Sequence, residues 1–214
     1  MNQKCPNCDF IHFSSQDTCA RCGCDLEAPA KPNHPSPKML SRTIVCLGIC
    51  IALILAFYIS LIASSRSLDI EEKYKVRRAI AVLKDKGFTD EVALLESVTV
   101  FRGNDNWLNA SVPKEDAYAA TNFPFEIMTV YPDFFTYPAD DIERAAILLH
   151  EAQHLKGKNE QEAYDYVWRN RKALGWTRDT YLVSPVWLNV RRQTRDNDSE
   201  LFICHDKDYW DCSE

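Results

Sequence analysis

The stretch Asp140–Leu174, DDIERAAILLHEAQHLKGKNEQEAYDYVWRNRKAL, decides how the rest of this chain is interpreted. It predicts a helix, a break at Gly157 and a second helix, because apolar residues recur at helical spacing on both sides of the glycine. The first helix contains His150-Glu151-Ala152-Gln153-His154. Residues four apart share one face of an α-helix, so we expect both imidazoles to face one metal ion, with Glu151 beside it.

These residue types suit the chemistry of zinc. A catalytic zinc site keeps three protein ligands and leaves one position for water. A carboxylate beside that water takes its proton and passes it to a leaving amine, and Glu151 is placed for this role. In the alternative interpretation, His150 and His154 are helix-packing residues that bind no metal. The apolar run before them disfavours this, because unpaired polar groups on a buried helix are costly.

The third ligand is expected just after the first helix. The pattern extends to H-E-x-x-H-x-x-G-x-x-E, in which Gly157 lets the chain turn back toward the metal. Glu160 lies on the face of the second helix that continues with apolar residues and is therefore inward, so it is the predicted ligand. Glu162 lies on a more solvated stripe and remains the alternative.

At these residues the segment resembles the zincin metallopeptidases, and the glutamate on the second helix is similar to that of the gluzincin branch. The resemblance covers about residues 70–175. It implies an α+β fold, a zincin-like domain with a metal-binding helix and a small mixed sheet, which hydrolyses peptide bonds. It also implies that His150, His154 and Glu160 hold a catalytic Zn²⁺, with Glu151 as general base and then acid.

The glycine and its spacing to Glu160 also resemble metzincins, whose ligand at that position is a histidine or an aspartate. This chain has a glutamate there. Beyond the apolar segment its one methionine is Met128, upstream of the motif. The sequence therefore lacks a methionine turn, and we do not assign it to that branch.

Length and charge bound the remaining possibilities. The chain has 214 residues, 46% of them hydrophobic, and a formal net charge of -6. This length suits one modest domain with accessory segments. The acidic balance argues against nucleic acid as the main partner and leaves a peptide or protein substrate as the expectation.

The N-terminal segment, residues 1–27, contains two C-x-x-C pairs, Cys5 with Cys8 and Cys19 with Cys22. Each pair offers two thiolates to one side of a tetrahedral ion, which predicts a second, structural Zn²⁺ in a small zinc ribbon. The segment resembles the short zinc ribbons of bacterial membrane proteins, and the ribbon is a candidate site for a protein partner. Cys24 is a spare thiol or an alternative ligand. Two disulfides are the rival interpretation, which the paired spacing disfavours.

Residues 28–43 contain a proline-rich linker, and residues 44–63 carry no charge over twenty positions. Twenty apolar residues suffice to cross a bilayer once, so we expect a single-pass transmembrane helix followed by the zincin-like domain, residues 66–214. A cleaved signal peptide is the rival, but the preceding segment is too long for a short basic n-region.

The orientation in the membrane rests on cysteine usage, because the basic residues flanking the helix are indecisive. Zinc-bound thiolates favour the reducing cytosol, whereas Cys204 and Cys212 suit a disulfide in an oxidising compartment. We therefore expect a cytoplasmic ribbon and an extracytoplasmic peptidase domain.

The rest of the chain gives weaker patterns. A helix is predicted over 68–86 with Gly87 as its stop, then a short helical run over 91–95. Residues 97–102 and 106–112 predict a hairpin, and 125–131 predict a strand just ahead of the metal helix. That strand is either an edge that binds a peptide by strand addition or an ordinary core strand.

Residues 133–138 predict an aromatic loop that covers the site or packs under it. Two apolar runs after residue 176 predict short strands or helix ends. A donor for the transition-state oxyanion is expected among Tyr181, Arg191 and His205, chosen by residue type alone, with a structural role as the alternative for each.

Two functions remain open from the sequence. The first is a membrane-anchored zinc peptidase that uses Glu151 as its base. The second is a catalytically inactive zincin-like binding or scaffold protein, which keeps its metal for structure and interacts through the ribbon.

Overall fold

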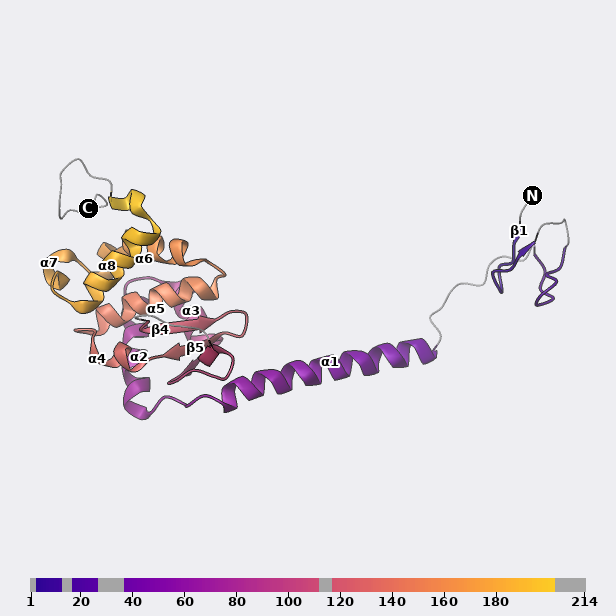
Figure 1. The fold of residues 1–214 in the computed structure, drawn as a ribbon, viewed down its shortest axis with the longest axis horizontal. Helices are drawn as coiled ribbons and strands as arrows, with labels where there is room; N and C mark the ends of the chain where they lie inside the picture. The colour runs from indigo at the N-terminus through magenta and orange to yellow at the C-terminus, as the bar shows by residue number, and fades with distance from the viewer. Residues whose placement is uncertain (1–2, 13–16, 27–36, 112–116, 203–214) are drawn as a thin grey trace. The chain divides into compact units, whose positions relative to one another are not determined.

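The computed structural model describes residues 3–12, 17–26, 37–111 and 117–202. The chain divides after Ile54 into two compact units. Figure 1 shows their helices and strands in chain order. The expected disulfide between Cys204 and Cys212 lies outside the described residues, and so does His205.

The first unit contains a small cysteine-rich fold. Strands β1 (Gln3–Lys4) and β2 (Ile11–His12) pair antiparallel. The buried interior consists of Cys5, Cys19 and Leu26, with two further cysteines packed against it. An interior this small offers little apolar burial to stabilise the segment.

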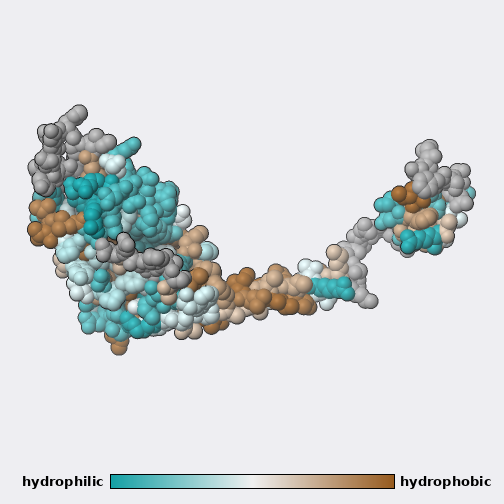
Figure 2. Space-filling view, in the orientation of Figure 1, coloured by the Kyte–Doolittle hydropathy of each residue, from teal (hydrophilic) through white to brown (hydrophobic). Residues whose placement is uncertain are grey.

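Helix α1 (Pro37–Ala63) begins inside the segment interpreted as a linker and ends where the apolar run ends. Its part Met39–Ala63 has 25 residues and a mean hydropathy of 2.8. At 1.5 Å per residue it is about 37 Å long, enough to cross a hydrocarbon layer of about 30 Å. Its apolar surface is seen in Figure 2. The expectation of one apolar helix of membrane-spanning length is confirmed for the described residues.

The second unit is a mixed α+β fold, mostly helical, with a three-stranded sheet among its described residues. The strand order is β3 (Val100–Arg102), β5 (Ile127–Val130), β4 (Ala119–Asn122). The central strand β5 runs parallel to β3 and antiparallel to β4. The coarse expectation of an α+β fold with a small mixed sheet is confirmed.

The predicted hairpin over 97–112 is wrong. β3 pairs with β5, and residues 106–111 form a turn and the short helix η1 (Asn109–Ser111) instead of a strand. The side chain of Asn106 accepts hydrogen bonds of 3.0 Å from the backbone N–H groups of Leu108 and Asn109. Such local hydrogen bonds compete with strand pairing, and here they prevail.

The strand predicted over 125–131 exists as β5, but it is not an edge. Its four residues are buried and it pairs on both sides. The edge that lies along α5 is β4, whose Thr121 contacts Glu151. The sequence pattern identified the strand with the most apolar residues, which is the one that belongs in the centre of the sheet.

Helices surround this sheet. α2 (Ile70–Asp85) begins with a capping box from Asp69 and ends before Gly87, as predicted, and α3 (Thr89–Ser97) follows. The expected aromatic loop contains the short helix α4 (Pro132–Thr136), in which Phe134 is buried. Figure 1 shows α5 (Asp141–Leu155) between the sheet and α6 (Glu160–Leu174), in agreement with its contacts to β4 and α6.

The apolar runs near the C-terminus are helical, not strands. α7 (Arg178–Tyr181), α8 (Pro185–Asn197) and η2 (Ser199–Phe202) follow α6. A cluster of three fully buried tryptophans, Trp168, Trp176 and Trp187, joins this part to α6. The ring centroids of Trp176 and Trp187 are 4.9 Å apart. Three such rings bury enough apolar surface to fix α8 over α6, which matters for the site.

Candidate metal centre

Helix α5 carries three of the candidate site residues near its C-terminal end. The side chain of Asp140 begins the helix by accepting hydrogen bonds from the backbone of Ile142 and Glu143. The following apolar run is buried, which fixes the rotation of α5 about its axis. As a result His150 and His154 share a half-buried face, and Glu151 is buried beside them.

The turn between α5 and α6 selects one of the two candidate glutamates. Gly157 has φ +76°, a conformation that glycine adopts without steric cost. Asn159 and Glu162 then form a capping box, with hydrogen bonds of 2.9 and 3.1 Å between side chain and backbone. Glu162 also pairs with Lys158 at 2.8 Å. The structure therefore places Glu162 in the helix cap and Glu160 against the histidines.

The side chains of three residues, His150, His154 and Glu160, come together at one point. The Nε2 atoms of His150 and His154 are 3.1 Å apart. The Glu160 carboxylate lies 3.2 Å from the first and 3.4 Å from the second. These residues could hold a metal ion, since one ligand atom from each lies within 4.8 Å of the others.

The surroundings orient both imidazoles. His154 Nδ1 lies 2.9 Å from the carbonyl oxygen of Lys158, so an N–H at Nδ1 donates to it and the Nε2 lone pair faces the cluster. The ring of His150 packs against the ring of Tyr164, with centroids 4.3 Å apart. Among the described residues the buried His150 Nδ1 has no hydrogen-bond partner.

The charges at this cluster attract a cation. Burial lowers the pKa of His154, but the hydrogen bond to Glu160 and the charge of Glu151 outweigh it and raise the pKa to about 9. Hydrogen bonds from His150 and His154 hold the pKa of Glu160 far below its ordinary value. A metal ion bound by these residues would take the place of the proton that the imidazoles share with Glu160.

Glu151 is held from the edge strand. The hydroxyl of Thr121 donates a hydrogen bond of 2.8 Å to its Oε2 atom. The Glu151 residue is only 5% exposed. A carboxylate that is buried and oriented by one donor keeps its other oxygen for a proton or a substrate group.

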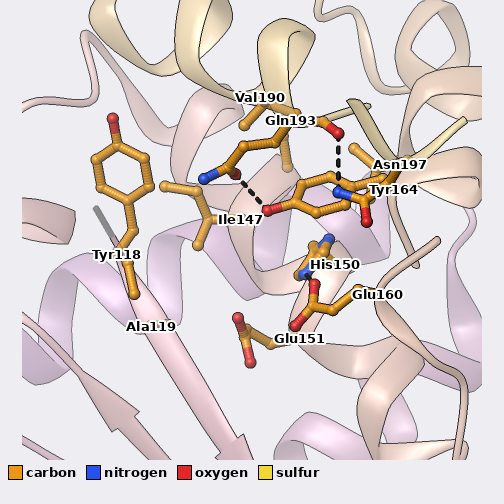
Figure 3. A pocket seen from close by; sticks show the side chains of 13 residues that line it. Tyr118, Ala119, Ile147, His150, Glu151, Glu160, Tyr164, Val190, Gln193 and Asn197 are labelled. Atoms are coloured by element: carbon orange, nitrogen blue, oxygen red, sulfur yellow. Dashed lines mark hydrogen bonds and ion pairs between the residues drawn. The ribbon is translucent and has the colours of Figure 1, made fainter. Parts of the chain in front are cut away.

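A cavity of about 300 Å³ opens beside these residues. Figure 3 shows side chains from four elements around it. They are Tyr118 just before β4 and Ala119 on β4, Ile147, His150 and Glu151 on α5, Glu160 and Tyr164 on α6, and Val190, Gln193 and Asn197 on α8. The Tyr164 hydroxyl donates a hydrogen bond to the side-chain carbonyl of Gln193, and Figure 3 shows this link between α6 and α8.

Two of the three residues named as oxyanion donors, Tyr181 and Arg191, are among the described residues, and neither lines this cavity. Tyr181 donates a hydrogen bond of 2.6 Å to Asp140, at the start of α5 and about 20 Å along the helix from His154. Arg191 stacks over Phe202. These contacts favour the structural role that was the alternative for both residues.

Sequence reasoning missed the polar residues that do line the cavity. Tyr164 is four residues after Glu160 and so shares its helix face, a signal that was available in the sequence. Gln193 and Asn197 carry no such signal, because α8 is placed over the site by the tryptophan cluster. Burial and the charges of Glu160 and Glu151 raise the pKa of Tyr164, so its phenol stays protonated at neutral pH.

The N-terminal unit brings five cysteines together. One set, Cys5, Cys19, Cys22 and Cys24, has its sulfur atoms within 4.8 Å of one another and could hold a metal ion. Cys8 joins it, with its sulfur 3.6 Å from that of Cys19. Cys24 therefore lies within the cluster, where it could serve as the alternative ligand. Hydrogen bonds from the backbone and the thiol of Cys24 lower the pKa of Cys22, which favours the thiolate that metals bind.

Comparison of the chain with protein-family models finds no match, and comparisons with curated proteins and with solved structures find none either.

Proposed function

We propose that this protein is a membrane-anchored, zinc-dependent peptidase whose catalytic zinc is held by His150, His154 and Glu160. One observation carries the proposal: three donors of the types that zinc prefers meet beside a buried, oriented carboxylate at the wall of a cavity. Zinc bonds of about 2.05 Å in a tetrahedron separate the ligand atoms by roughly 3.3 Å. The Nε2–Nε2 separation of 3.1 Å is close to that value, and Glu160 offers one carboxylate oxygen 3.2 Å from His150 and the other 3.4 Å from His154.

Each residue of the site has a defined task. When bound, zinc lowers the pKa of a coordinated water to near neutrality and polarises a carbonyl group. Glu151 accepts a proton at Oε1 while Thr121 holds Oε2, and later gives the proton to the leaving amine. Lys158 fixes the tautomer of His154 through its carbonyl. Tyr164, which stays neutral, would break its hydrogen bond to Gln193 and donate one to the substrate carbonyl instead.

The N-terminal unit completes the proposal with a structural zinc held by Cys5, Cys8, Cys19 and Cys22. Zinc–sulfur bonds of about 2.3 Å separate tetrahedral sulfur ligands by roughly 3.75 Å. The separations Cys5–Cys22 and Cys8–Cys19 are 3.7 and 3.6 Å, whereas Cys24 lies only 3.1 Å from Cys5. The short Cys5–Cys24 separation supports Cys24 as the residue left out, whereas the set of four sulfur atoms that lie within 4.8 Å of one another includes Cys24 in place of Cys8. The helix α1 would cross the membrane once between this unit and the peptidase domain.

The test uses the full chain in detergent, with zinc counted by elemental analysis and hydrolysis followed on an unstructured protein such as casein. We expect two zinc ions per chain and loss of hydrolysis when a chelator removes the more accessible one. Glu151→Gln should keep both zinc ions and lose hydrolysis, because an amide does not accept the proton. The matched control Glu71→Gln changes a glutamate whose side chain is 77% exposed and should change neither.

Wild-type protein that binds zinc at His150 and His154 but hydrolyses no tested protein would contradict this proposal. It would support the alternative, a zincin-like scaffold that works through its ribbon. Hydrolysis by Glu151→Gln at the wild-type rate would contradict the role of Glu151.

A further inference from the structure

The last turns of α1 belong to the second unit, which begins at Leu55. The ring of Phe57 lies 5.5 Å from that of Trp107 and 5.4 Å from that of Phe125. The indole N–H of Trp107 donates a hydrogen bond of 3.2 Å to the hydroxyl of Ser60, and Leu61 is fully buried. Residues of the folded domain, Trp107 and Phe125, therefore pack against the apolar C-terminal end of α1.

The attachment continues just past the helix through Arg102 on β3. Its guanidinium donates hydrogen bonds to the carbonyl oxygens of Ile62 and Ser65, and to the Ser65 hydroxyl at 2.8 Å. The backbone N–H of Gly103 also donates to the carbonyl of Arg66 at 2.8 Å. These bonds satisfy carbonyl groups that a helix C-terminus leaves unpaired, so they fix the sheet to the end of α1.

Next to this attachment, large apolar side chains project outward. Trp107, Leu108 and Phe123 are 51%, 37% and 60% exposed, and we call these three residues the apolar foot. They come from two segments, the turn after β3 and the turn between β4 and β5. Phe125 belongs to the second of these turns and contacts Phe57, as Trp107 does. Exposed apolar groups gathered at one place usually mark a surface that something covers.

The position of these contacts along α1 indicates what covers the foot. The uncharged stretch 44–63 has twenty residues and is about 30 Å long, the thickness of the hydrocarbon layer. Phe57 precedes Ala63 by six residues, so it lies about 9 Å inside the end of that stretch. Side chains that touch Phe57 and Ser60 are therefore level with the outer part of the bilayer. Tryptophan in particular favours that interface.

We propose that the apolar foot inserts into the surface of the bilayer beside α1 and holds the candidate metal centre at the membrane. The occupant is the lipid interface, because the foot is continuous with the one helix of the described chain that is long and apolar enough to span a membrane. The apolar foot gives the domain a second contact with the membrane besides α1, so the orientation of the domain relative to the bilayer is restricted.

This placement determines where the metal centre acts. Strand β4 leads from the cavity toward the foot, because Ala119 lines the cavity and Phe123 follows the strand directly. Thr121, which holds Glu151, precedes Phe123 by two residues, a separation of about 7 Å along a strand. If the site hydrolyses peptides as proposed above, its substrates are protein segments at the membrane surface, next to a transmembrane helix or an inserted chain.

The test measures depth by tryptophan fluorescence, with the full chain in vesicles of phosphatidylcholine brominated on the acyl chains, which quench nearby indoles. Three of the tryptophans, Trp168, Trp176 and Trp187, are fully buried in the domain. We expect quenching of the wild type to fall in Trp107→Phe and to rise in Phe123→Trp. Val183→Trp is the matched control, because Val183 is 86% exposed. It lies near Tyr181 and the start of α5, about 16 Å along that helix from Glu151.

Equal quenching of Phe123→Trp and Val183→Trp would overturn the proposal. So would an indole at position 123 that is shielded from both the brominated lipid and aqueous acrylamide, because another protein or a second copy would then cover the foot. Phe123→Trp is made in the otherwise native chain, so the test stands even where Trp107→Phe fails to fold.

The substrate class has its own readout. Reporter proteins carry one cleavable segment at 3, 10 or 30 residues from a transmembrane helix, in the same vesicles. We expect cleavage of the nearest segments at least 10-fold faster than of the farthest, and Phe123→Ser should remove this preference. Equal cleavage at all distances would overturn the substrate class. No cleavage at any distance would contradict the peptidase function, while the quenching result still decides whether the foot is in the bilayer.

Discussion

Thr121 donates a hydrogen bond of 2.8 Å to the carboxylate of Glu151, and so joins the edge strand to the helix that carries both histidines. The two residues are thirty positions apart in sequence. The bond leaves one carboxylate oxygen to act and prevents the other from rotating away. The chemistry of the proposed base therefore depends on the position of β4.

Replacing Thr121 tests this dependence. Thr121→Val removes the donor at nearly constant shape, and we expect kcat to fall by about 10-fold, the cost of one lost hydrogen bond to a charged group. Zinc content and KM should stay unchanged, because Thr121 contacts neither the metal ligands His150, His154 and Glu160 nor the N-terminal cysteines. Thr121→Ser keeps the hydroxyl and should restore most of the rate. Equal rates for the valine and serine variants would contradict a positioning role.

Glutamine substitutions at Glu160 and Glu162 decide which of the two glutamates binds the metal. Glu160→Gln removes a charged ligand of the metal. Zinc affinity should therefore fall by more than the roughly 10- to 100-fold lost when a residue that only hydrogen-bonds to a metal ligand is replaced. Glu162→Gln is a matched control, because glutamine also forms the capping box with Asn159. Glu162→Gln should leave zinc affinity unchanged and change the free energy of unfolding by no more than about 0.5 kcal/mol. Titration with a competing chelator measures both. The reverse pattern would make Glu162 the ligand.

The N-terminal cysteine cluster contains one more cysteine than the four ligands of a tetrahedral zinc ion. We expect Cys8→Ser to weaken cobalt binding and to reduce the thiolate-to-cobalt charge-transfer absorption, and Cys24→Ser to leave that absorption intact. The reason is the sulfur spacing, which fits a tetrahedron at Cys8–Cys19 and is too short at Cys5–Cys24. Absorption that survives in Cys8→Ser and disappears in Cys24→Ser would exchange the two roles.

A buried glutamate should make stability depend on pH. Glu91 on α3 accepts hydrogen bonds from Gln153, Lys156 and Tyr166. Burial raises its pKa, but Lys156 and the other donors outweigh this and bring it below the ordinary 4.5. The ionised form is thus favoured by folding, and its contribution is present above pH 4.5 and lost as the pH falls through the lower folded pKa.

Glu91→Gln should therefore reduce the free energy of unfolding by about 2 kcal/mol at pH 7. The difference from the wild type should shrink below pH 4.5. Urea unfolding followed by tryptophan fluorescence at pH 3.5 to 7 measures this. An unchanged difference across that range would show that the carboxylate charge contributes nothing.

Local patterns were sufficient for much of this molecule. The helix α5, the break at Gly157 and the placing of His150 and His154 on one face all follow from spacing along the sequence. Glu160 follows as well, because it lies only ten residues from His150 and a single turn joins them. The paired cysteines and the apolar helix α1 are local features too.

Features that depend on distant segments were not predictable in this way. The sequence of 97–112 has strand-forming residues on both sides of a turn, yet β3 pairs with β5 instead. For residues 125–131 the sequence left open an edge strand or a core strand, and only the pairing of β5 with a strand on each side shows that it lies in the centre of the sheet. Gln193 and Asn197 reach the cavity only because three buried tryptophans fix α8 over α6.

The sequence by itself determined which groups lie one helical turn apart, and therefore the candidate metal ligands, the cysteine cluster and the apolar helix. Helical spacing is a short-range property that neighbouring residues fully specify. Only the tertiary structure decided that Thr121 holds Glu151, that Tyr164 and Gln193 meet at the cavity, and that Trp107 and Phe125 pack on Phe57. Those contacts depend on how the whole domain buries its apolar surface, and no short segment contains that information.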